Sequence, residues 1–387
     1  MTTRTTMTAP DFENLHLERY PSTSDKNLRA WNAADEYLTS LFEQYSFNSE
    51  SKILIINDQF GAISCSLSQQ YANIQIHNWT DSFLSKTAIE KNLERNKLPP
   101  MSKFVDQCSS KLRSELIFDY VFIRTPKHNS LLEFQLNTIT SHINLDTVIV
   151  ATGMTKEIHN STTTLFENII GPTKTSLAKK KARLVYPNPL NIKENESPIN
   201  SVVEYKIEEY EITSYGFAGV FSREKLDIGS RVLLKHLPET TEKQKLMDLG
   251  CGAGILGTIA AKQNPSLNVS FSDESFLAIE SAKMTFEKNT SQTANYFITD
   301  VLEGVEDRDF DHILCNPPFH QQNVQTLSIA NKMFRQSARK LKSNGELRVV
   351  ANRHLKYRPM LNQYFKRVKI ISDDPKFVVW LAKQPIG

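Results

Sequence analysis

Asp248-Leu249-Gly250-Cys251-Gly252-Ala253-Gly254 is the stretch of sequence that decides the fold. It begins within the apolar run Lys245–Leu249 and leads into helical spacing from Gly257, so it predicts a strand, a tight turn and a helix. A Cβ atom in such a turn would collide with a close ligand or forbid a positive φ, which explains the glycines. The spacing GxGxG after an acid differs from GxGxxG, the dinucleotide-binding fingerprint. The stretch predicts a nucleotide-like ligand at the carboxyl end of a strand.

Strands and helices alternate after this turn, which indicates an α/β fold with a mainly parallel sheet. An Asp-Asp-Pro turn near the end of the chain predicts one antiparallel hairpin that closes the sheet. The predicted elements are strands at Asn268–Ser272, Tyr296–Thr299, Phe310–Cys315 and Glu346–Ala351, a helix at Ser275–Asn289, and the hairpin within Val368–Ala382.

Two acids follow the next two predicted strands. Asp273 stands at the interval from the glycine turn at which a carboxylate accepts hydrogen bonds from both hydroxyls of a ribose. Asp300 could then accept a hydrogen bond from an adenine amino group. The alternative is that both are turn acids, since Asp is common where strands end.

A faint repeat relates the two halves of the chain. Gly61 of Asn57-Asp58-Gln59-Phe60-Gly61-Ala62 falls on Gly252, 191 residues later, and four other landmarks recur at 192 residues. Duplication of one domain explains such an ordered series better than chance does. The other pairs are Asp35 with Asp227, Asp81 with Asp273, Phe118-Asp119 with Phe310-Asp311, and Pro126 with Pro318.

A proline-rich, polar connector separates the two copies. It spans Gly171 to Ser214, with a basic helical tip expected near Leu177 to Arg183. We therefore expect a first domain over residues 1–190, a linker over 191–214 and a second domain over 215–387.

Asn316-Pro317-Pro318-Phe319 directly follows a predicted strand. The prolines restrict the backbone, so the Asn316 side-chain oxygen and the Pro317 carbonyl can present paired acceptors at one point. Acceptors that hold both hydrogens of a planar NH2 group favour its pyramidal, nucleophilic form, without a metal or a nucleophilic side chain. Phe319 offers a ring for a flipped-out base, a contact worth about 1–3 kcal/mol. The plainer alternative is a Pro-Pro loop with a packed phenylalanine.

The glycine turn together with Asn-Pro-Pro-Phe resembles the class I S-adenosylmethionine-dependent methyltransferases that act on exocyclic amines. Pro317 to Gln322, Asn57 to Ala62, and Gly219-Val220-Phe221-Ser222 with Asp227 and Gly229 resemble the duplicated ribosomal RNA guanine-N2 methyltransferases, the large-subunit (23S) members most closely. The resemblance covers almost the whole chain. It implies two tandem Rossmann-like methyltransferase domains, each a mainly parallel seven-stranded sheet flanked by helices.

The resemblance also implies roles for particular residues. S-adenosylmethionine is the expected cofactor, the base is held by Asn316, Pro317 and Phe319, and no metal is expected. The expected reaction is methylation of the exocyclic N2 of a guanine in 23S ribosomal RNA, either naked or in a partly assembled large subunit. Adenine N6, a protein glutamine, or a non-catalytic RNA-binding assembly role remain alternatives. The cofactor contacts are expected from Asp248, Gly250, Gly252, Gly254, Asp273 and Asp300, with Phe221 near the methionine end.

The first copy departs from this chemistry. It keeps one of the three glycines, Gln59 and Phe60 place side chains where a cofactor would lie, and Arg124-Thr125-Pro126-Lys127 replaces Asn-Pro-Pro-Phe. We expect this domain to bind no cofactor. Two cations at the former substrate mouth and the run Lys179 to Arg183 suggest that it positions RNA or supports folding of the second domain.

A second basic segment lies in the catalytic half. Residues 353–369 contain six cations and no acid, interleaved with Tyr357, Tyr364 and Phe365. This mixture suits phosphates and unpaired bases, whereas the alternative is a solvated amphipathic helix.

Composition sets the remaining expectations. The 387 residues are 40% apolar and 23% charged with a net charge of +3, which excludes disordered and collagenous chains and by itself selects no partner. No apolar stretch is long enough to span a membrane, and Met1 to Pro10 lacks a signal-peptide core. We expect a cytoplasmic monomer. The four dispersed cysteines, Cys65, Cys108, Cys251 and Cys315, fit packing roles rather than a zinc site.

Overall fold

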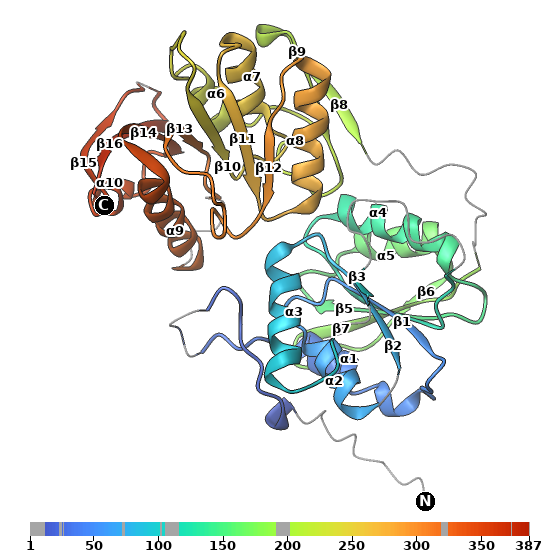
Figure 1. Ribbon diagram of the computed structural model, residues 1–387. Helices are drawn as coiled ribbons and strands as arrows, with labels where there is room; N and C mark the ends of the chain where they lie inside the picture. Colours follow the sequence, from blue (N-terminus) through green and yellow to red (C-terminus); the bar gives the residue numbers. More distant parts are fainter. Residues whose placement is uncertain are drawn as a thin grey trace, which may run out of the picture. The chain divides into compact units, whose positions relative to one another are not determined.

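The computed structural model divides the chain into two compact units, Met1–Asn200 and Ser201–Gly387 (Figure 1). It describes residues 12–22, 25, 27–71, 74–100, 103–104, 116–190, 202–318, 324–372 and 374–386. Within these ranges no helix combines the length and apolar character needed to cross a membrane. Each unit is described by itself below.

The second unit is built on a mixed sheet of seven described strands in the order β12-β11-β10-β13-β14-β16-β15. β12 to β14 run parallel, and β16 pairs antiparallel with both β14 and β15. The strands are β10 (Lys245–Leu249), β11 (Asn268–Asp273), β12 (Asn295–Ile298), β13 (Phe310–Cys315), β14 (Leu341–Asn352), β15 (Phe365–Ile370) and β16 (Phe377–Pro385). The helices are α6 (Ile228–Leu234), α7 (Ile255–Gln263), α8 (Phe276–Asn289), α9 (Val324–Lys340) and α10 (Tyr357–Leu361), and β8 (Val203–Ile207) pairs with β9 (Ile212–Gly216).

Helices cover both faces of this sheet. Met247 and Leu249 of β10 pack in one buried cluster with Phe334 of α9, whereas the Asp248 carboxylate accepts a hydrogen bond from the Gly257 N–H of α7. Successive side chains of a strand point to opposite faces. α7 and α9 therefore lie on opposite faces, and the glycine turn leads from β10 to the α7 side.

Several sequence predictions are confirmed in this unit. β10 and β13 have the predicted bounds, and α8 begins after Ser275, whose hydroxyl caps it by accepting a hydrogen bond from the Ala278 N–H. The predicted terminal hairpin is β15 with β16. Local apolar runs, helical spacing and turn residues were sufficient to predict these elements.

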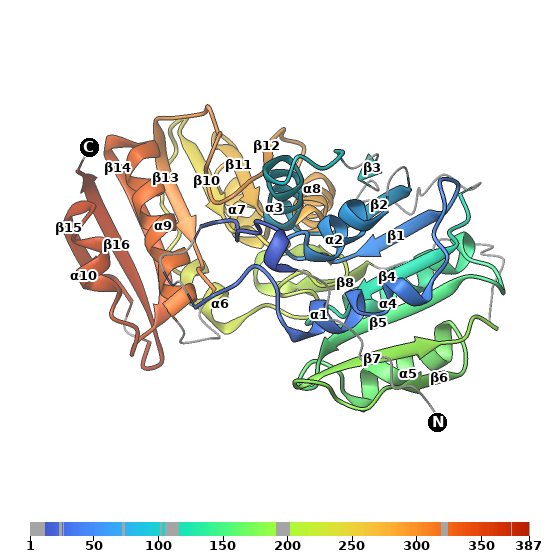
Figure 2. The same cartoon turned by 90° about the horizontal axis from the view of Figure 1, so that it is seen from below.

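The first unit contains a second mixed sheet with the strand order β3-β2-β1-β4-β5-β7-β6. Its outer pair, β7 with β6, is antiparallel (Figure 2). The strands are β1 (Lys52–Ile56), β2 (Gln75–Trp79), β3 (Lys103–Phe104), β4 (Tyr120–Arg124), β5 (Val148–Met154), β6 (Thr173–Thr175) and β7 (Ala182–Pro187). The helices are α1 (Ala33–Thr39), α2 (Ala62–Gln70), α3 (Phe83–Arg95), α4 (Asn129–Ile139) and α5 (Asn160–Ile169).

The two sheets have the same order position by position, but one predicted equivalence is wrong. Gly61 and Gly254 both precede a helix in the left-handed conformation, with φ of 84° and 72°. Gly61 therefore corresponds to Gly254, not to Gly252, because β1 and β10 begin 193 residues apart and so do the helices α2 and α7 that follow them.

The predicted connector from Gly171 to Ser214 is also corrected. β6 and β7 complete the first sheet, and β8 with most of β9 occupies residues 203–214 of the expected linker. The basic tip is not helical: Lys180 and Lys181 have φ of 50° and 63°, so the chain turns sharply between the two strands. Residues 191–201 lie outside the described ranges.

Side chains of α8 hold an extended segment along the helix. Asn289 Oδ1 accepts a hydrogen bond from Thr213 N (2.8 Å), Thr285 Oγ1 from Tyr215 N (3.0 Å) and Ser281 Oγ from Phe217 N (3.0 Å). These three acceptors are four residues apart, so they form one row on the helix. This row leads the chain to the loop that contains Phe221. In the first unit, Asn92 of α3 and Asn96, which caps its C-terminal end, accept hydrogen bonds from the backbone N–H groups of Glu18 and His16.

Gly254 is predicted to be essential for packing α7 against α8. A Cβ added there would lie 2.7 Å from Ala282 Cα at a φ of +72°, so Gly254→Ala should lower the free energy of unfolding by about 3 kcal/mol. Gly304 is the matched control, since its φ is +75° and nothing lies within 4 Å of its added Cβ. Gly304→Ala should cost about 1 kcal/mol. Equal losses in urea unfolding would contradict the packing argument.

Candidate active site

Four predicted site segments converge at one edge of the second sheet. Leu249 is in register with both Ser272 and Cys315, and Asp273 is in register with Ile298. Since these strands are parallel, the glycine turn, Asp273, Asp300 and Asn316 all follow carboxyl ends at the same edge. This is where open α/β sheets bind ligands.

The Asp273 carboxylate closes the glycine turn. Its Oδ2 accepts a hydrogen bond from Gly252 N and its Oδ1 one from Ser275 N, both at 3.0 Å. Burial raises the pKa of Asp273, and these backbone hydrogen bonds oppose that rise. The carboxylate is thus held in a defined orientation beside the glycine backbone.

The loop that contains Phe221 lies close to the glycine turn. Gly252 has a φ of +52°, and an added Cβ would stand 3.4 Å from the Phe221 carbonyl oxygen and 3.8 Å from Phe221 Cβ. The Phe221 side chain is 46% exposed. The Phe221 loop therefore lies against the middle glycine, which is buried, whereas Gly250 at the start of the turn is exposed.

Asp248 is the buried acid that precedes the glycine turn in β10. It is 1% exposed, and its Oδ2 accepts the Gly257 N–H of α7 at 2.9 Å. Burial raises the pKa of Asp248 to about 7, and Oδ1 has no hydrogen-bond partner among the described residues. In this geometry Asp248 supports the start of α7.

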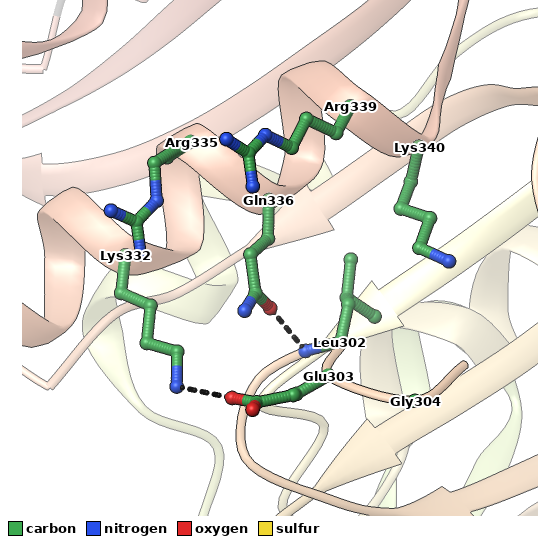
Figure 3. Close-up of a pocket in the computed structure, with 8 residues that line it drawn as sticks. All are labelled: Leu302, Glu303, Gly304, Lys332, Arg335, Gln336, Arg339 and Lys340. Carbon is green, nitrogen blue, oxygen red and sulfur yellow. Dashed lines mark hydrogen bonds and ion pairs between the residues drawn. The ribbon is translucent and has the colours of Figure 1, made fainter. Parts of the chain in front are cut away.

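Asp300 is engaged by a residue that the sequence analysis missed. It is 4% exposed and forms an ion pair with Lys332 of α9, whose Nζ also lies 2.9 Å from Glu303 Oε2. In Figure 3, Lys332 and Gln336 reach from α9 to the loop that carries Leu302 and Glu303. Lys332 thus neutralises the carboxylate expected to meet adenine. It gave no local sequence signal, since it is one of several cations on an amphipathic helix.

The side-chain amide of Asn316 is hydrogen-bonded at its nitrogen but not at its oxygen. Its Nδ2 donates to Ser230 Oγ (2.9 Å) and to Asp227 Oδ2 (3.3 Å). A carboxylate only accepts, so Asp227 requires the amide nitrogen to face it. Asn316 Oδ1 is buried without a partner among the described residues. Such an orphaned acceptor is costly unless a ligand supplies a donor.

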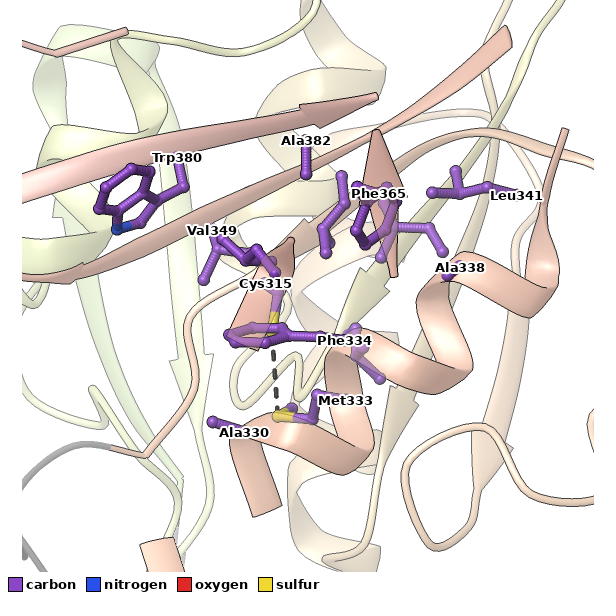
Figure 4. Packing of buried hydrophobic residues seen from close by; sticks show 14 of the residues in the cluster. Cys315, Ala330, Met333, Phe334, Ala338, Leu341, Val349, Phe365, Trp380 and Ala382 are labelled. Carbon is purple, nitrogen blue, oxygen red and sulfur yellow. Dashed lines mark hydrogen bonds between the residues drawn. The ribbon is translucent and has the colours of Figure 1, made fainter. Parts of the chain in front are cut away.

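The strand before Asn316 is firmly anchored. Cys315 is fully buried, and its Sγ lies 3.9 Å from Met333 Sδ of α9 (Figure 4). Pro317 is buried and Pro318 is exposed. Phe319, the predicted stacking residue, lies outside the described residues. Cys65, Cys251 and Cys315 are buried free thiols, and no described cluster of His, Cys, Asp and Glu could hold a metal ion.

Asp227 and Ser230 are site residues that the sequence reasoning did not assign. Asp227 caps α6 by accepting the Ser230 N–H at 3.1 Å. Its recurrence as Asp35 at the 192-residue interval was the available signal.

The first unit replaces this arrangement with a buried ion pair. Arg124 occupies the position of Asn316, and its Nε lies 3.3 Å from Asp35 Oδ1. Arg124 is 2% exposed, so it is not one of the surface cations that the predicted RNA-positioning role of this unit would use. Lys127 at the end of the same motif is exposed. A guanidinium only donates hydrogen bonds, so Arg124 cannot accept hydrogen bonds from the N–H groups of a substrate amine.

The basic segment 353–369 is also reinterpreted. It is neither one helix nor a stacking surface, because α10 and β15 divide it and Tyr357 and Phe365 are buried in the core. Arg353 donates to the Asp374 and Pro375 carbonyls of the terminal hairpin. The exposed cations that remain are Lys356, Arg358, Lys366, Arg367 and Lys369.

Comparison with known proteins defines the class of this site. Residues 211–381 match the methyltransferase small domain, and residues 5–191 match the RLMG N-terminal domain. The T. thermophilus 16S rRNA N2 G1207 methyltransferase, solved with AdoMet and guanosine, has a TM-score of 0.71 at 20% identity over 90% of this chain and 92% of its own. The fold is the α/β fold of class I methyltransferases with mixed sheets.

Full-length relatives identify the family. The chain is 38% identical to the ribosomal RNA large subunit methyltransferase G of Vibrio vulnificus over 95% of this chain and 96% of the relative. It is also 38% identical to that of Pseudoalteromonas translucida over 96% of both. The chain belongs to the ribosomal RNA large subunit methyltransferase G family.

Proposed function

We propose that this chain transfers a methyl group from S-adenosylmethionine to the exocyclic N2 of a guanine in 23S ribosomal RNA. The observation that carries the proposal is the buried, unpartnered Asn316 Oδ1, whose orientation is set by Asp227 and Ser230. Family membership supports the substrate class, since the relatives are named as methyltransferases of large-subunit ribosomal RNA.

The chain's own residues bind and orient the amine. Asn316 Oδ1 and the Pro317 carbonyl accept its two hydrogens, so the nitrogen lone pair is withdrawn from the ring and turned outward. Catalysis is then mostly positioning. The bound cofactor supplies an electrophilic methyl group carried on sulfur.

The residues around the glycine turn fit this cofactor. Gly250 is exposed at the turn, and the Asp273 carboxylate, held there by the N–H groups of Gly252 and Ser275, would accept the ribose hydroxyls. Asp300 with Lys332 would lie on the adenine side. Asp248 would affect cofactor binding indirectly, because its carboxylate holds the start of α7 through the Gly257 N–H group.

We further propose that the first unit is a diverged copy of the same domain that binds no cofactor. Its sheet has the same strand order, Gly61 matches Gly254, and the Asp35–Arg124 pair replaces the acceptor site. The proposed working form is a cytoplasmic monomer.

Labelled cofactor tests the substrate. The chain should label 23S ribosomal RNA from cells that lack it, and alkaline digestion with nucleoside analysis should give N2-methylguanosine. Label in N6-methyladenosine or in a protein fraction would replace the guanine assignment. Absence of label with retained RNA binding would favour a non-catalytic assembly role.

Ser230→Ala tests the orientation of the amide. Loss of one hydrogen bond to Asn316 should lower kcat about fivefold, equivalent to about 1 kcal/mol, with KM for RNA nearly unchanged. Ser337→Ala is the control, because Ser337 is an equally buried serine whose hydroxyl has no described partner. An effect on KM alone would contradict a role in orienting Asn316.

A further inference from the structure

The turn between β6 and β7 has an unusual choice of residues. Lys179 N donates to Ala182 O (2.9 Å) and Ala182 N to Lys179 O (2.8 Å), so Lys180 and Lys181 alone form a two-residue hairpin loop. Both have positive φ, 50° and 63°. This type of turn strongly favours Asn-Gly, because a residue with a long side chain is strained at these angles. The backbone geometry of the turn by itself would therefore favour residues other than lysine at both positions.

The hairpin tip, defined here as residues 174–183, is strongly basic. It contains five cations, and no acid occurs from residue 168 to residue 193. Lys180 pairs with Glu36 at 3.0 Å, while Lys174 and Lys181 are exposed and have no acidic partner in the part of the chain that the structure describes. The five cations are Lys174, Lys179, Lys180, Lys181 and Arg183.

An apolar residue projects from the same tip. The Leu177 side chain is 89% exposed, although its backbone carbonyl accepts from the Tyr37 hydroxyl at 3.4 Å. Lys179 Nζ lies 5.5 Å from the Tyr37 ring centroid. Lys179 and Lys180 therefore attach the tip to α1, while the Leu177 side chain and Lys181 are exposed.

The equivalent hairpin of the second unit differs in charge. The chain between β15 and β16 contains Asp373, Asp374 and Pro375 in place of the three lysines. Asp374 accepts the backbone N–H groups of Lys376 and Phe377. A basic tip is thus no requirement of this architecture.

We propose that the hairpin tip of the first unit is an RNA-docking site, at which the lysines contact backbone phosphates and Leu177 packs against a ribose or an unpaired base. This inference rests on the proposed function in that RNA is the substrate. Lysines at these two positive-φ positions make the turn less stable than Asn-Gly would, but they place two positive charges at the tip. This choice of residues fits binding of a polyanion. An apolar side chain amid cations suits nucleic acid, whose sugars and base faces are apolar.

A double substitution separates binding from folding. K180N/K181G installs the favoured turn, so the melting temperature should rise while affinity for in vitro transcribed 23S ribosomal RNA falls at least about fivefold at 0.1 M salt. The slope of log K against log salt should become shallower by about one unit or more. Lys97→Gly is the matched control, since Lys97 also has a positive φ of 54° outside the tip; it should leave RNA affinity unchanged.

Leu177→Ser tests the apolar contact. It should weaken RNA binding without changing the salt slope or the melting temperature. RNA affinity within twofold of the unchanged chain in K180N/K181G would overturn the proposal. Weakened binding to subunit particles with unchanged binding to free RNA would also overturn it, in favour of an acidic protein partner.

The two proposals can fail separately. RNA binding that depends on the tip without methyl transfer by the unchanged chain would remove the proposed reaction and keep the docking site. Normal methyl transfer and RNA affinity in K180N/K181G would remove the docking site and keep the reaction.

Discussion

Asn316→Ala is expected to lower the rate of methyl transfer about 100- to 1,000-fold, the usual loss for one preorganised polar group at a reacting centre. The substitution removes the buried Oδ1 that has no described partner, and with it one of the two acceptors for the amine. It also leaves Asp227 and Ser230 without their donor. Single-turnover kinetics with saturating enzyme and undermodified 23S ribosomal RNA measure this loss.

Cofactor affinity gives the internal check. Asn316 follows β13, whereas the glycine turn follows β10 and Asp273 ends β11, so S-adenosylmethionine should bind Asn316→Ala almost as tightly as the unchanged chain. Asn362→Ala, an exposed asparagine after α10, should retain full activity. Full turnover in Asn316→Ala would remove the proposed enzymatic role of this residue and favour the non-catalytic alternative.

Asp35→Ala should lower the free energy of unfolding by about 3–5 kcal/mol, because it leaves a buried guanidinium without its counter-charge. Arg124 is 2% exposed, and its Nε and Nη1 have no hydrogen-bond partner among the described residues. Asp35 also accepts the Asn32 N–H at the start of α1, so the helix cap is lost with the ion pair. Urea unfolding followed by circular dichroism measures the change.

Two variants separate these contributions. Arg124→Met combined with Asp35→Asn replaces the ion pair by neutral groups and should be close to the unchanged chain in stability. Glu36→Ala removes the neighbouring carboxylate, which pairs with the exposed Arg29 and Lys180, and should cost less than about 1 kcal/mol. If Asp35→Ala were as mild as Glu36→Ala, the buried pair would not be important for stability.

Local sequence patterns predicted the elements of the second unit well. The bounds of β10 and β13, the extent of α8 and the terminal hairpin follow from apolar runs, helical spacing and turn residues within a few positions of one another. The same reasoning was wrong between Gly171 and Ser214. There, prolines and lysines indicated a connector, whereas pairing with β5 makes β7 part of the first sheet.

The sequence by itself determined the class of fold and the sheet edge at which the predicted site residues meet, because these depend on strand order and on motifs at strand ends. Only the tertiary structure decided how Asn316 is turned and that Arg124 is buried. Each of these residues meets an aspartate 89 positions earlier in the chain, Asp227 or Asp35. A contact over that distance leaves no local pattern, since it exists only after the helix and the strand have packed together.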